Sequence, residues 1–500
     1  MRKIYEERPE LLAFLLASAC TLAMILVLYF PSSTGLANNG DFLRITAPNG
    51  IGFIDEKPNK DRYTPNFIMK YTKSDNDSLV KKLYYFFNTD YSTYDYVSSQ
   101  SVLIKASKIA NFAWNKLTGM SGSNYNICFL SFIYILMMAG AFYLILRFVL
   151  ETWGGFSCIF SFAVLLLAFC DQGYLLYFNS FYGEALQYAS TLLAVGLYLK
   201  LAMEKGAGRL HFALYYLAVL MMGMSKYANA PVGIIFATLP IFLPTKKKRR
   251  KATLAAASAG VCLILAFYCS SLTARWIEED TTYNSVFSGV LLGSESPEQD
   301  LAELGLNPEF AVLADTESYQ KEYPIDVKSE DFKNEFYGKV SKGKIAAFYL
   351  KHPARLFQAA EKSMSFAKRI RPNYLANTQE PETPREQSYR FSIWERLRIK
   401  SPTNNLACMI LVMLAAAVLI LRAKNLALSA LMSAVLISTG MNFMLPYMGN
   451  GISDIAKHMF GFVYLYDMLQ FTLAGAALYK LRGLIVSREP LKRKWPVQNM

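Results

Sequence analysis

The chain has 500 residues, of which 53% are hydrophobic, and its mean hydropathy is +0.21. This hydrophobic content exceeds what a soluble domain of such length carries, so the composition excludes an ordinary soluble globular protein. The formal net charge is +14. In a membrane protein such an excess of basic residues mainly sets the orientation of the helices.

Apolar stretches of nearly bilayer-spanning length recur along the chain. They predict about ten membrane spans, since a helix needs roughly 20 apolar residues to cross about 30 Å of hydrocarbon. Lys226 and Asn229 interrupt the fifth and sixth stretches, which leaves a re-entrant pair open for that region. The predicted spans lie near residues 11–31, 126–150, 155–171, 185–203, 209–224, 228–244, 252–273, 404–422, 425–445 and 455–480.

Basic residues orient these spans. The run at residues 246–251 is entirely Lys and Arg, and more basic residues follow at Arg422, Lys424 and in the carboxy-terminal tail. Placing them inside predicts a multi-pass protein of a bacterial cytoplasmic membrane with both termini cytoplasmic. A short basic loop between spans is what orientation alone requires, so nucleic acid is not an expected partner.

Two long segments interrupt the membrane pattern and fall outside under this topology. The expected organisation is an amino-terminal transmembrane module at residues 1–272 that includes a first outer loop at 32–124. An outer loop region follows at 273–403, and carboxy-terminal helices with a basic tail occupy 404–500. The fold class is therefore an all-α polytopic bundle in which the two outer loops carry interfacial helices.

The first outer loop contains a tyrosine-rich stretch from Tyr84 to Tyr96 and then a helical pattern over residues 98–117. Val102, Ile109 and Leu117 recur there at helical spacing, with lysines elsewhere on the surface. An amphipathic helix between two spans is expected to lie in the plane of the membrane interface. A helix within a small soluble cap is the alternative.

Asp41 is the first candidate for chemistry. It follows the first span in the sequence Asn38-Asn39-Gly40-Asp41-Phe42, close to the bilayer boundary. Sugar transfer needs a base that takes a proton from the acceptor hydroxyl, and one Asp within hydrogen-bond reach can do this. Gly40 permits close approach of a substrate. The alternative is a structural turn, because Asn-Asn-Gly-Asp is good turn chemistry.

Glu184 stands at the start of a later span, after a stretch in which Asn179 and Tyr182 are expected to line a sugar-sized pocket. Favourable placement at a helix amino terminus is the competing explanation for this acid. Lys226 interrupts an otherwise apolar stretch and would suit a phosphate partner. Its alternative is snorkelling of the ammonium group to the interface.

Asp454, Lys457 and His458 open the last span and share one helix face. Two cationic groups held by an acid could neutralise a donor phosphate as charge develops there; anchoring at the interface is the alternative. His352, before Pro353, is a further candidate for substrate binding. Asp-x3-His alone supplies too few ligands for a metal site, so no cofactor is predicted, and a divalent cation is left open without a motif that indicates it.

In order and spacing, these motifs resemble the bacterial glycan-biosynthesis hexose transferases typified by WsfD, which belong to the GT-C class of integral membrane glycosyltransferases. The resemblance runs from about residue 35 to 470. It is carried by residues 39–42 (Asn-Gly-Asp-Phe), 179–184 (Asn-Ser-Phe-Tyr-Gly-Glu), 283–287 (Tyr-Asn-Ser-Val-Phe), His352-Pro353 and Asp454-x-x-Lys457-His458.

The resemblance implies a polyprenyl-phosphate-linked sugar donor, a glycan or wall-polymer acceptor and an inverting transfer on the extracytoplasmic face, with Asp41 as the catalytic residue. The chain lacks a tight Asp-x-Asp in the first loop, which departs from paired-acid versions of the class. The expected function is hexose transfer. A transporter or flippase of lipid-linked oligosaccharide is the alternative, and a scaffold of an envelope assembly is a weaker one.

Overall fold

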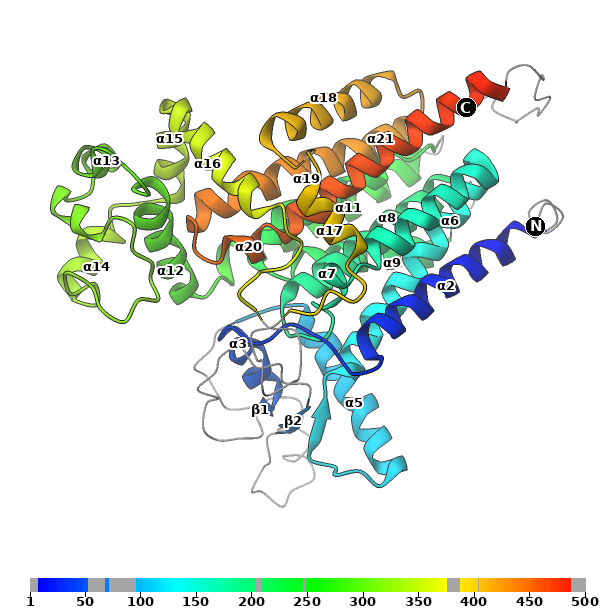
Figure 1. Ribbon diagram of the computed structural model, residues 1–500, viewed down its shortest axis with the longest axis horizontal. Coiled ribbons are helices and arrows are strands. Elements are labelled where there is room, and N and C mark those ends of the chain that lie inside the picture. Colours follow the sequence, from blue (N-terminus) through cyan, green and yellow to red (C-terminus); the bar gives the residue numbers. More distant parts are fainter. Residues whose placement is uncertain are drawn as a thin grey trace.

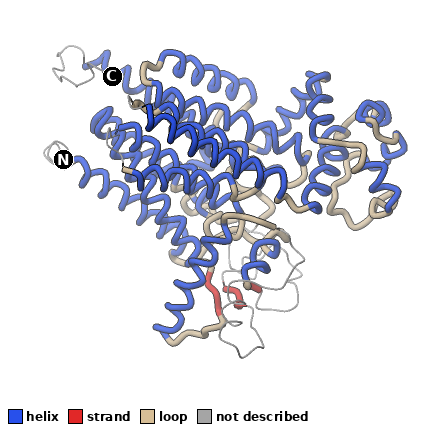
Figure 2. Tube along the Cα trace, turned by 180° about the vertical axis from the view of Figure 1, so that it is seen from behind, coloured by secondary structure: helices blue, strands red, loops and turns tan. Residues whose placement is uncertain are grey.

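The structure is a computed structural model that describes residues 8–52, 68–71, 96–203, 208–245, 248–375, 387–402 and 404–486. Long helices run side by side through its centre, and both chain ends emerge at the same end of this bundle (Figure 1). Seen from behind, the described regular structure is almost entirely helical, with only a few short strands (Figure 2). The predicted helical class is confirmed.

Among the described residues, five helices are long and apolar enough to cross a membrane. They are α2 (Pro9–Tyr29), the continuous stretch Cys128–Phe169 formed by α6 (Cys128–Val164) and a π-helical turn, α8 (Gly183–Met203), α11 (Lys248–Ser271) and α19 (Leu426–Asn450). The chain is therefore a multi-span membrane protein.

Helices occupy all ten stretches in which a span was predicted, but they do so unequally. Gly154 adopts a non-helical conformation that breaks α6 between the second and third predicted spans. Shorter apolar helices lie at α9 (Arg209–Gly223), at Tyr227–Phe242 around α10 (Ala230–Thr238), and at α18 (Leu406–Arg422); α21 (Phe460–Val486) is the last helix. The count of ten spans thus stays a prediction beyond the five long helices.

The first outer loop departs from a purely helical fold. It contains a three-stranded antiparallel sheet of β1 (Ile51–Gly52), β2 (Ile68–Tyr71) and β3 (Asn124–Asn126), with Ile51 opposite Tyr71 and Met69 opposite Tyr125. The expected tyrosine-rich stretch lies outside the described residues, apart from Tyr96. Strands this short carry too little periodicity to be recognised in a sequence.

Helix α5 (Gln100–Thr118) lies between β2 and β3 in the chain and is largely apolar on its exposed face. Its buried face carries Ser107, Lys108 and Asn111, whereas Ile109 and Leu117 are exposed, Leu117 to 84%. The helix projects from the end of the bundle opposite the termini (Figure 1). An exposed apolar face beside the membrane fits the interfacial helix that the pattern predicts.

The second outer loop forms a lobe beyond the bundle. Its elements are α12 (Arg275–Ser285), α13 (Pro297–Leu304), α14 (Glu330–Phe336), α15 (Lys342–Lys351) and α16 (Pro353–Phe366). Tyr283, Phe287, Phe332 and Phe336 pack against one another inside it in stacked, tilted and edge-on pairs, with ring centroids 4.5–6.4 Å apart. The lobe therefore has an aromatic core of its own, which the amphipathic patterns did not predict. Helix α17 (Ile393–Lys400) then leads back to α18.

Candidate functional site

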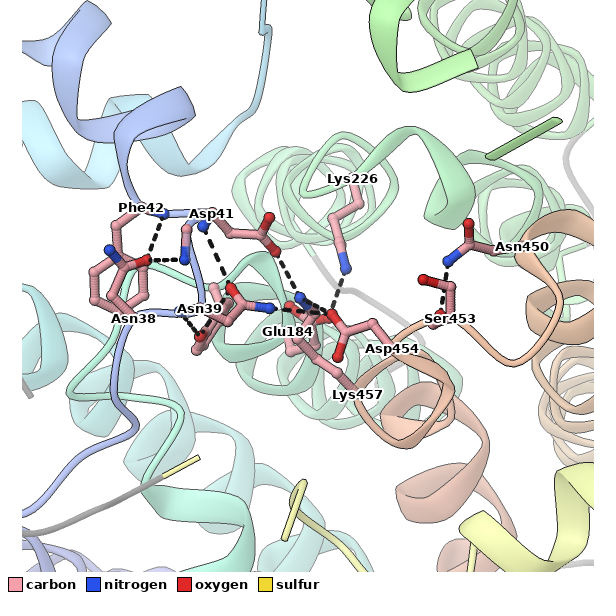
Figure 3. A network of polar contacts seen from close by, with 12 residues as sticks. Asn38, Asn39, Asp41, Phe42, Glu184, Lys226, Asn450, Ser453, Asp454 and Lys457 are labelled. Carbon is pink, nitrogen blue, oxygen red and sulfur yellow. Dashed lines mark hydrogen bonds and ion pairs between the residues drawn. The ribbon is translucent and has the colours of Figure 1, made fainter. Parts of the chain in front are cut away.

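A cavity of about 1110 Å³ opens where the outer ends of the helices meet the two outer loops. Its wall combines the loop after α2, the start of α8, the break between α9 and α10, part of α12, and the segment that joins α19 to α21. The charged side chains of these segments converge from ribbons far apart in the sequence (Figure 3). The cavity therefore brings together several of the predicted site residues.

The first wall of the cavity is the turn at residues 38–42. The side-chain oxygen Oδ1 of Asn38 accepts hydrogen bonds from the backbone N–H groups of Gly40 (2.8 Å) and Phe42 (3.1 Å). Gly40 has a φ of +106°, a conformation that a residue with a Cβ rarely adopts. The turn reading of this motif is thus correct, and the turn presents Asp41 to the cavity.

Asn179 and Tyr182 support this turn from below. The Asn179 side chain donates to the carbonyl of Thr34 (2.7 Å), and the Tyr182 hydroxyl donates to that of Ala37 (2.6 Å) while accepting from the Asn39 N–H (3.1 Å). Both residues are buried and neither lines the cavity. The expectation that they line a sugar pocket is wrong, because their polar groups are used to fix the chain.

Asp41 carries two cations on a single oxygen. Its Oδ2 lies 2.6 Å from Nζ of Lys457 and 3.1 Å from Nη2 of Arg44. Burial opposes ionisation of this carboxyl, but the charges of Arg44 and Lys457 outweigh burial and hold its pKa well below its usual range. Asp41 is therefore ionised at neutral pH and is a weak base while both cations stay in place.

Lys457 joins Asp41 to Asp454. The short helix α20 (Ile455–His458) begins after Asp454, whose backbone is left-handed with φ +49°, and the Lys457 ammonium forms an ion pair with the Asp454 carboxylate as well. The ammonium also lies 5.0 Å from the centre of the Tyr182 ring. Burial raises the pKa of Asp454 although Lys457 acts against it, whereas the cations on Asp41 hold the pKa of that carboxyl low.

The turn before α20 is fixed by the outer lobe. Asn284 of α12 donates to the side chain of Asn450 (3.0 Å), and Asn450 donates to the carbonyl of Ser453 (2.8 Å). Gly451 has φ +57°, and a Cβ there would lie 2.5 Å from the carbonyl oxygens of both Asn284 and Ser288. Close packing against the lobe therefore sets the position of Asp454 and Lys457.

Lys226 and Glu184 form a second ion pair in the same cavity. Nζ of Lys226 lies 2.5 Å from Oε1 of Glu184, and the two side chains are 13% and 3% exposed. Gly183 makes room for the pair, because a Cβ there would lie 2.8 Å from the Lys226 side chain. Oε2 of Glu184 is buried with no partner among the described residues, so this acid has an unused acceptor beside the cavity.

The two predicted histidines differ in position. His458 lines the cavity, but Asp454 does not hold it as expected: Oδ2 of Asp454 contacts Lys457 and Asn39, and Oδ1 has no hydrogen-bond partner among the described residues. His352 does not line the cavity; its Nε2 lies 2.7 Å from Oε2 of Glu303, between α15 and α16 of the outer lobe. The grouping of His352 with the other candidates is therefore wrong in this fold.

The rest of the cavity wall is mainly apolar, although polar side chains such as Gln187, Glu317 and Lys342 line it as well. Its apolar residues include Val232 of α10, Cys269 of α11, Ile277 of α12, and Leu445 and Met448 of α19. Within the described ranges, no group of three or more His, Cys, Asp or Glu side chains is arranged to hold a metal ion. The site therefore joins a cluster of paired charges to an apolar surface at the membrane boundary.

Comparison with known protein families identifies a match that covers nearly the whole chain. A model of the YfdI N-terminal transmembrane domain family matches residues 1–493. The chain belongs to this family. No curated protein and no solved structure matches it significantly. The family description identifies a transmembrane domain, in agreement with the multi-span structure, and assigns no reaction.

The sequence patterns overlooked several residues that shape the cavity of this YfdI-family chain. Arg44 was missed although it stands three residues after Asp41, a spacing at which side chains of one helical turn meet. Lys342 was missed because only the fold brings it beside the carbonyl of Gly449 (2.8 Å). Tyr96 was noted only as part of a tyrosine-rich stretch, and its ring lies 5.0 Å from the Arg44 guanidinium.

Proposed function

We propose that this protein is an integral membrane glycosyltransferase of the GT-C type, which moves a hexose from a polyprenyl-phosphate-linked donor to a cell-envelope glycan acceptor on the extracytoplasmic face, with inversion. One observation carries the proposal: Asp41, Glu184 and Asp454 meet Arg44, Lys226 and Lys457 in one cavity that also has an apolar wall. A lipid-linked phosphosugar presents matching chemistry, with an apolar tail, an anionic phosphate and a polyhydroxy ring.

The roles follow from chemical type. Asp41 is the general base that accepts the proton of the acceptor hydroxyl. The cationic side chains Arg44, Lys226 and Lys457 neutralise the phosphate as it leaves C1 of the sugar, and Arg44 offers the planar fork that suits phosphate oxygens. The unpaired Oε2 of Glu184 accepts a hydrogen bond from a sugar hydroxyl. His458 lines the same cavity and borders the ring.

The rest of the molecule supports this assignment. The loop after α2 and helix α20, which line the cavity, lie at the end of the bundle opposite both termini (Figure 1), and the charge distribution assigns the termini to the cytoplasm. Acids of a transporter are expected at mid-span, whereas Asp41 and Asp454 lie in turns outside α2 and α21. The two outer loops and the predicted set of about ten spans are in keeping with the proposed GT-C architecture, in which α5 seats the polyprenyl chain at the interface.

The test is transfer of radiolabelled hexose from synthetic polyprenyl-phosphate hexoses to a membrane glycan fraction by purified protein. We expect transfer by the wild type and a fall of about 10³-fold or more in Asp41→Asn, because loss of a general base costs on the order of 10²–10⁴ in rate. The anomeric configuration of the product, read by NMR, is expected to be inverted.

The matched control is Glu298→Gln, which neutralises an exposed acid of the outer lobe that does not line the cavity. It should transfer at the wild-type rate. Full transfer by a folded Asp41→Asn protein contradicts the assignment of the base. Absence of transfer by the wild type from every donor, together with movement of lipid-linked oligosaccharide across vesicles, contradicts the enzyme and supports a flippase.

A further inference from the structure

The starting observation is the crowding of Oδ2 of Asp41. Both Arg44 and Lys457 contact this one oxygen, so the proposed base is held by two positive charges. Around it, three acids (Asp41, Glu184, Asp454) face three cations (Arg44, Lys226, Lys457) in ion pairs. A carboxylate held this way has little tendency to take a proton from a hydroxyl.

The two cations on Asp41 are bound unequally. Lys457 is 2% exposed and contacts both Asp41 and Asp454, so its ammonium group is fixed between the two carboxylates. Arg44 is 18% exposed and, among the described residues, contacts one acid through Nη2 alone. Its Nε and Nη1 groups make no hydrogen bond within the described part of the chain, while the ring of Tyr96 supports its flat face.

We propose that the phosphate of the donor switches on the base: it draws the guanidinium of Arg44 away from Asp41 and thereby frees the carboxylate to accept the acceptor proton. The inference rests on the proposed function, since it assumes a phosphate donor in this cavity. Arg44 is the cation that moves, because within the described residues it has donors that make no hydrogen bond and a single acidic partner. Lys457 remains as the fixed link between Asp41 and Asp454.

The transfer step is balanced by this exchange. The proton of the acceptor hydroxyl passes to Asp41, and the acceptor oxygen forms a bond to C1 of the sugar. The bond between C1 and the phosphate oxygen breaks, and its electron pair stays on that oxygen. The phosphate thus gains one negative charge, which faces Arg44, while Asp41 loses one by protonation, so the charge of the site as a whole is unchanged.

The exchange predicts a competition that binding measurements detect without any turnover. If the phosphate must take Arg44 from Asp41, removing the Asp41 charge should tighten phosphate binding, and it should do so only when Arg44 is present. We would measure the affinity of the full-length protein in nanodiscs for farnesyl phosphate, with farnesol as the probe that lacks the phosphate. The variants are Asp41→Asn, Arg44→Met and the double variant.

We expect Asp41→Asn to bind farnesyl phosphate about tenfold more tightly than the wild type, a coupling typical of contacting charged groups, and to lose this gain in the Arg44→Met background. Asp454→Asn is the matched control: it removes an acid that does not contact Arg44, so its effect should be the same in both backgrounds. Arg44→Lys, which keeps the charge without the fork, serves if Arg44→Met does not fold and should give an intermediate coupling.

Equal tightening by Asp41→Asn with and without Arg44 overturns the exchange and leaves the proposed donor site standing, because phosphate would then compete for Lys457 instead. Failure of every folded variant and of the wild type to prefer farnesyl phosphate over farnesol overturns both the exchange and the proposed function. The exchange is supported if Asp41→Asn tightens the binding of farnesyl phosphate and the double variant with Arg44→Met does not.

Discussion

At the residue scale, the side chain of Asn38 fixes the turn that carries Asp41. Asn38 holds two backbone N–H groups of this turn with one side-chain oxygen. Without this oxygen, the N–H groups of Gly40 and Phe42 lose their hydrogen-bond acceptor. Its removal is therefore expected to loosen both the backbone of the turn and the position of the Asp41 carboxylate.

Asn38→Ala should therefore lower hexose transfer about tenfold to a hundredfold and destabilise the protein by about 1 kcal/mol, the usual cost of losing a side-chain cap. Asn38→Asp keeps an acceptor oxygen at the same place and is expected to restore most of the stability. Transfer rates and thermal unfolding of the three proteins check this. Equal stability of Asn38→Ala and the wild type would show that Asn38 does not hold the turn.

The ion pairs of Asp41 predict a dependence of stability on pH. The folded-state pKa of Asp41 lies below the value of about 3.9 that an unperturbed aspartate has. Its ion pairs therefore add stability that is complete above about pH 4 and is lost as the pH falls through the folded-state pKa. The difference in Tm between the wild type and Asp41→Asn should be largest near neutral pH and shrink toward about pH 3. A difference that stays constant over this range contradicts the pairing, and Glu298→Gln provides the baseline.

At the scale of elements, two nearby glycines at the end of α19 differ in how much the structure needs them. Gly451 has a positive φ and no room for a Cβ, whereas a Cβ on Gly449 would meet nothing within 4 Å. Gly451→Ala should displace the turn that carries Asp454, cost roughly 1–3 kcal/mol and abolish transfer. Gly449→Ala lies within α19 and should leave stability equal or slightly higher. Thermal unfolding and transfer assays of both variants check this pair; a tolerated Gly451→Ala would contradict it.

Helix α5 makes a prediction about membrane depth. Its exposed face carries Trp114, which is 51% exposed, one helical turn before the exposed Leu117. If this face lies in the lipid interface, brominated lipids should quench part of the tryptophan fluorescence, and Trp114→Phe should remove that part. Quenching that is identical in the wild type and Trp114→Phe would instead favour a soluble cap.

At the scale of the whole molecule, a buried ion pair ties the end of the second outer loop to the last helix. Arg398 of α17 contacts Asp467 of α21, and both side chains are fully buried. The same carboxylate accepts hydrogen bonds from the Trp394 indole and the Tyr174 hydroxyl, each at 2.5 Å. The loop thus returns to the bundle at one defined place.

Removing one partner of a buried pair leaves an uncompensated charge, so Arg398→Met should cost roughly 3–5 kcal/mol. The double variant Arg398→Met/Asp467→Leu removes both charges and is expected to recover a large part of this loss. Thermal unfolding in detergent measures both. A double variant that is less stable than Arg398→Met would show that the carboxylate is needed by its other partners more than by the arginine.

The sequence by itself determined the membrane class, the positions of the helices and the turn at Asp41, because hydrophobic runs and turn residues act over short stretches of chain. It also singled out Asp41, Glu184, Lys226 and Lys457 as polar residues at helix ends. Only the tertiary structure decided how these residues pair. Lys457 meets Asp41 across 416 positions, and no local pattern encodes a contact of that range.

The same long-range packing sorted the remaining candidates. It buried Asn179 and Tyr182 beneath the turn and placed His352 against Glu303. The physical reason is that a buried polar group must find a partner wherever the fold provides one. Residue type thus indicates which side chains are capable of chemistry, and packing decides which of them are left facing the cavity and which are used to hold the structure.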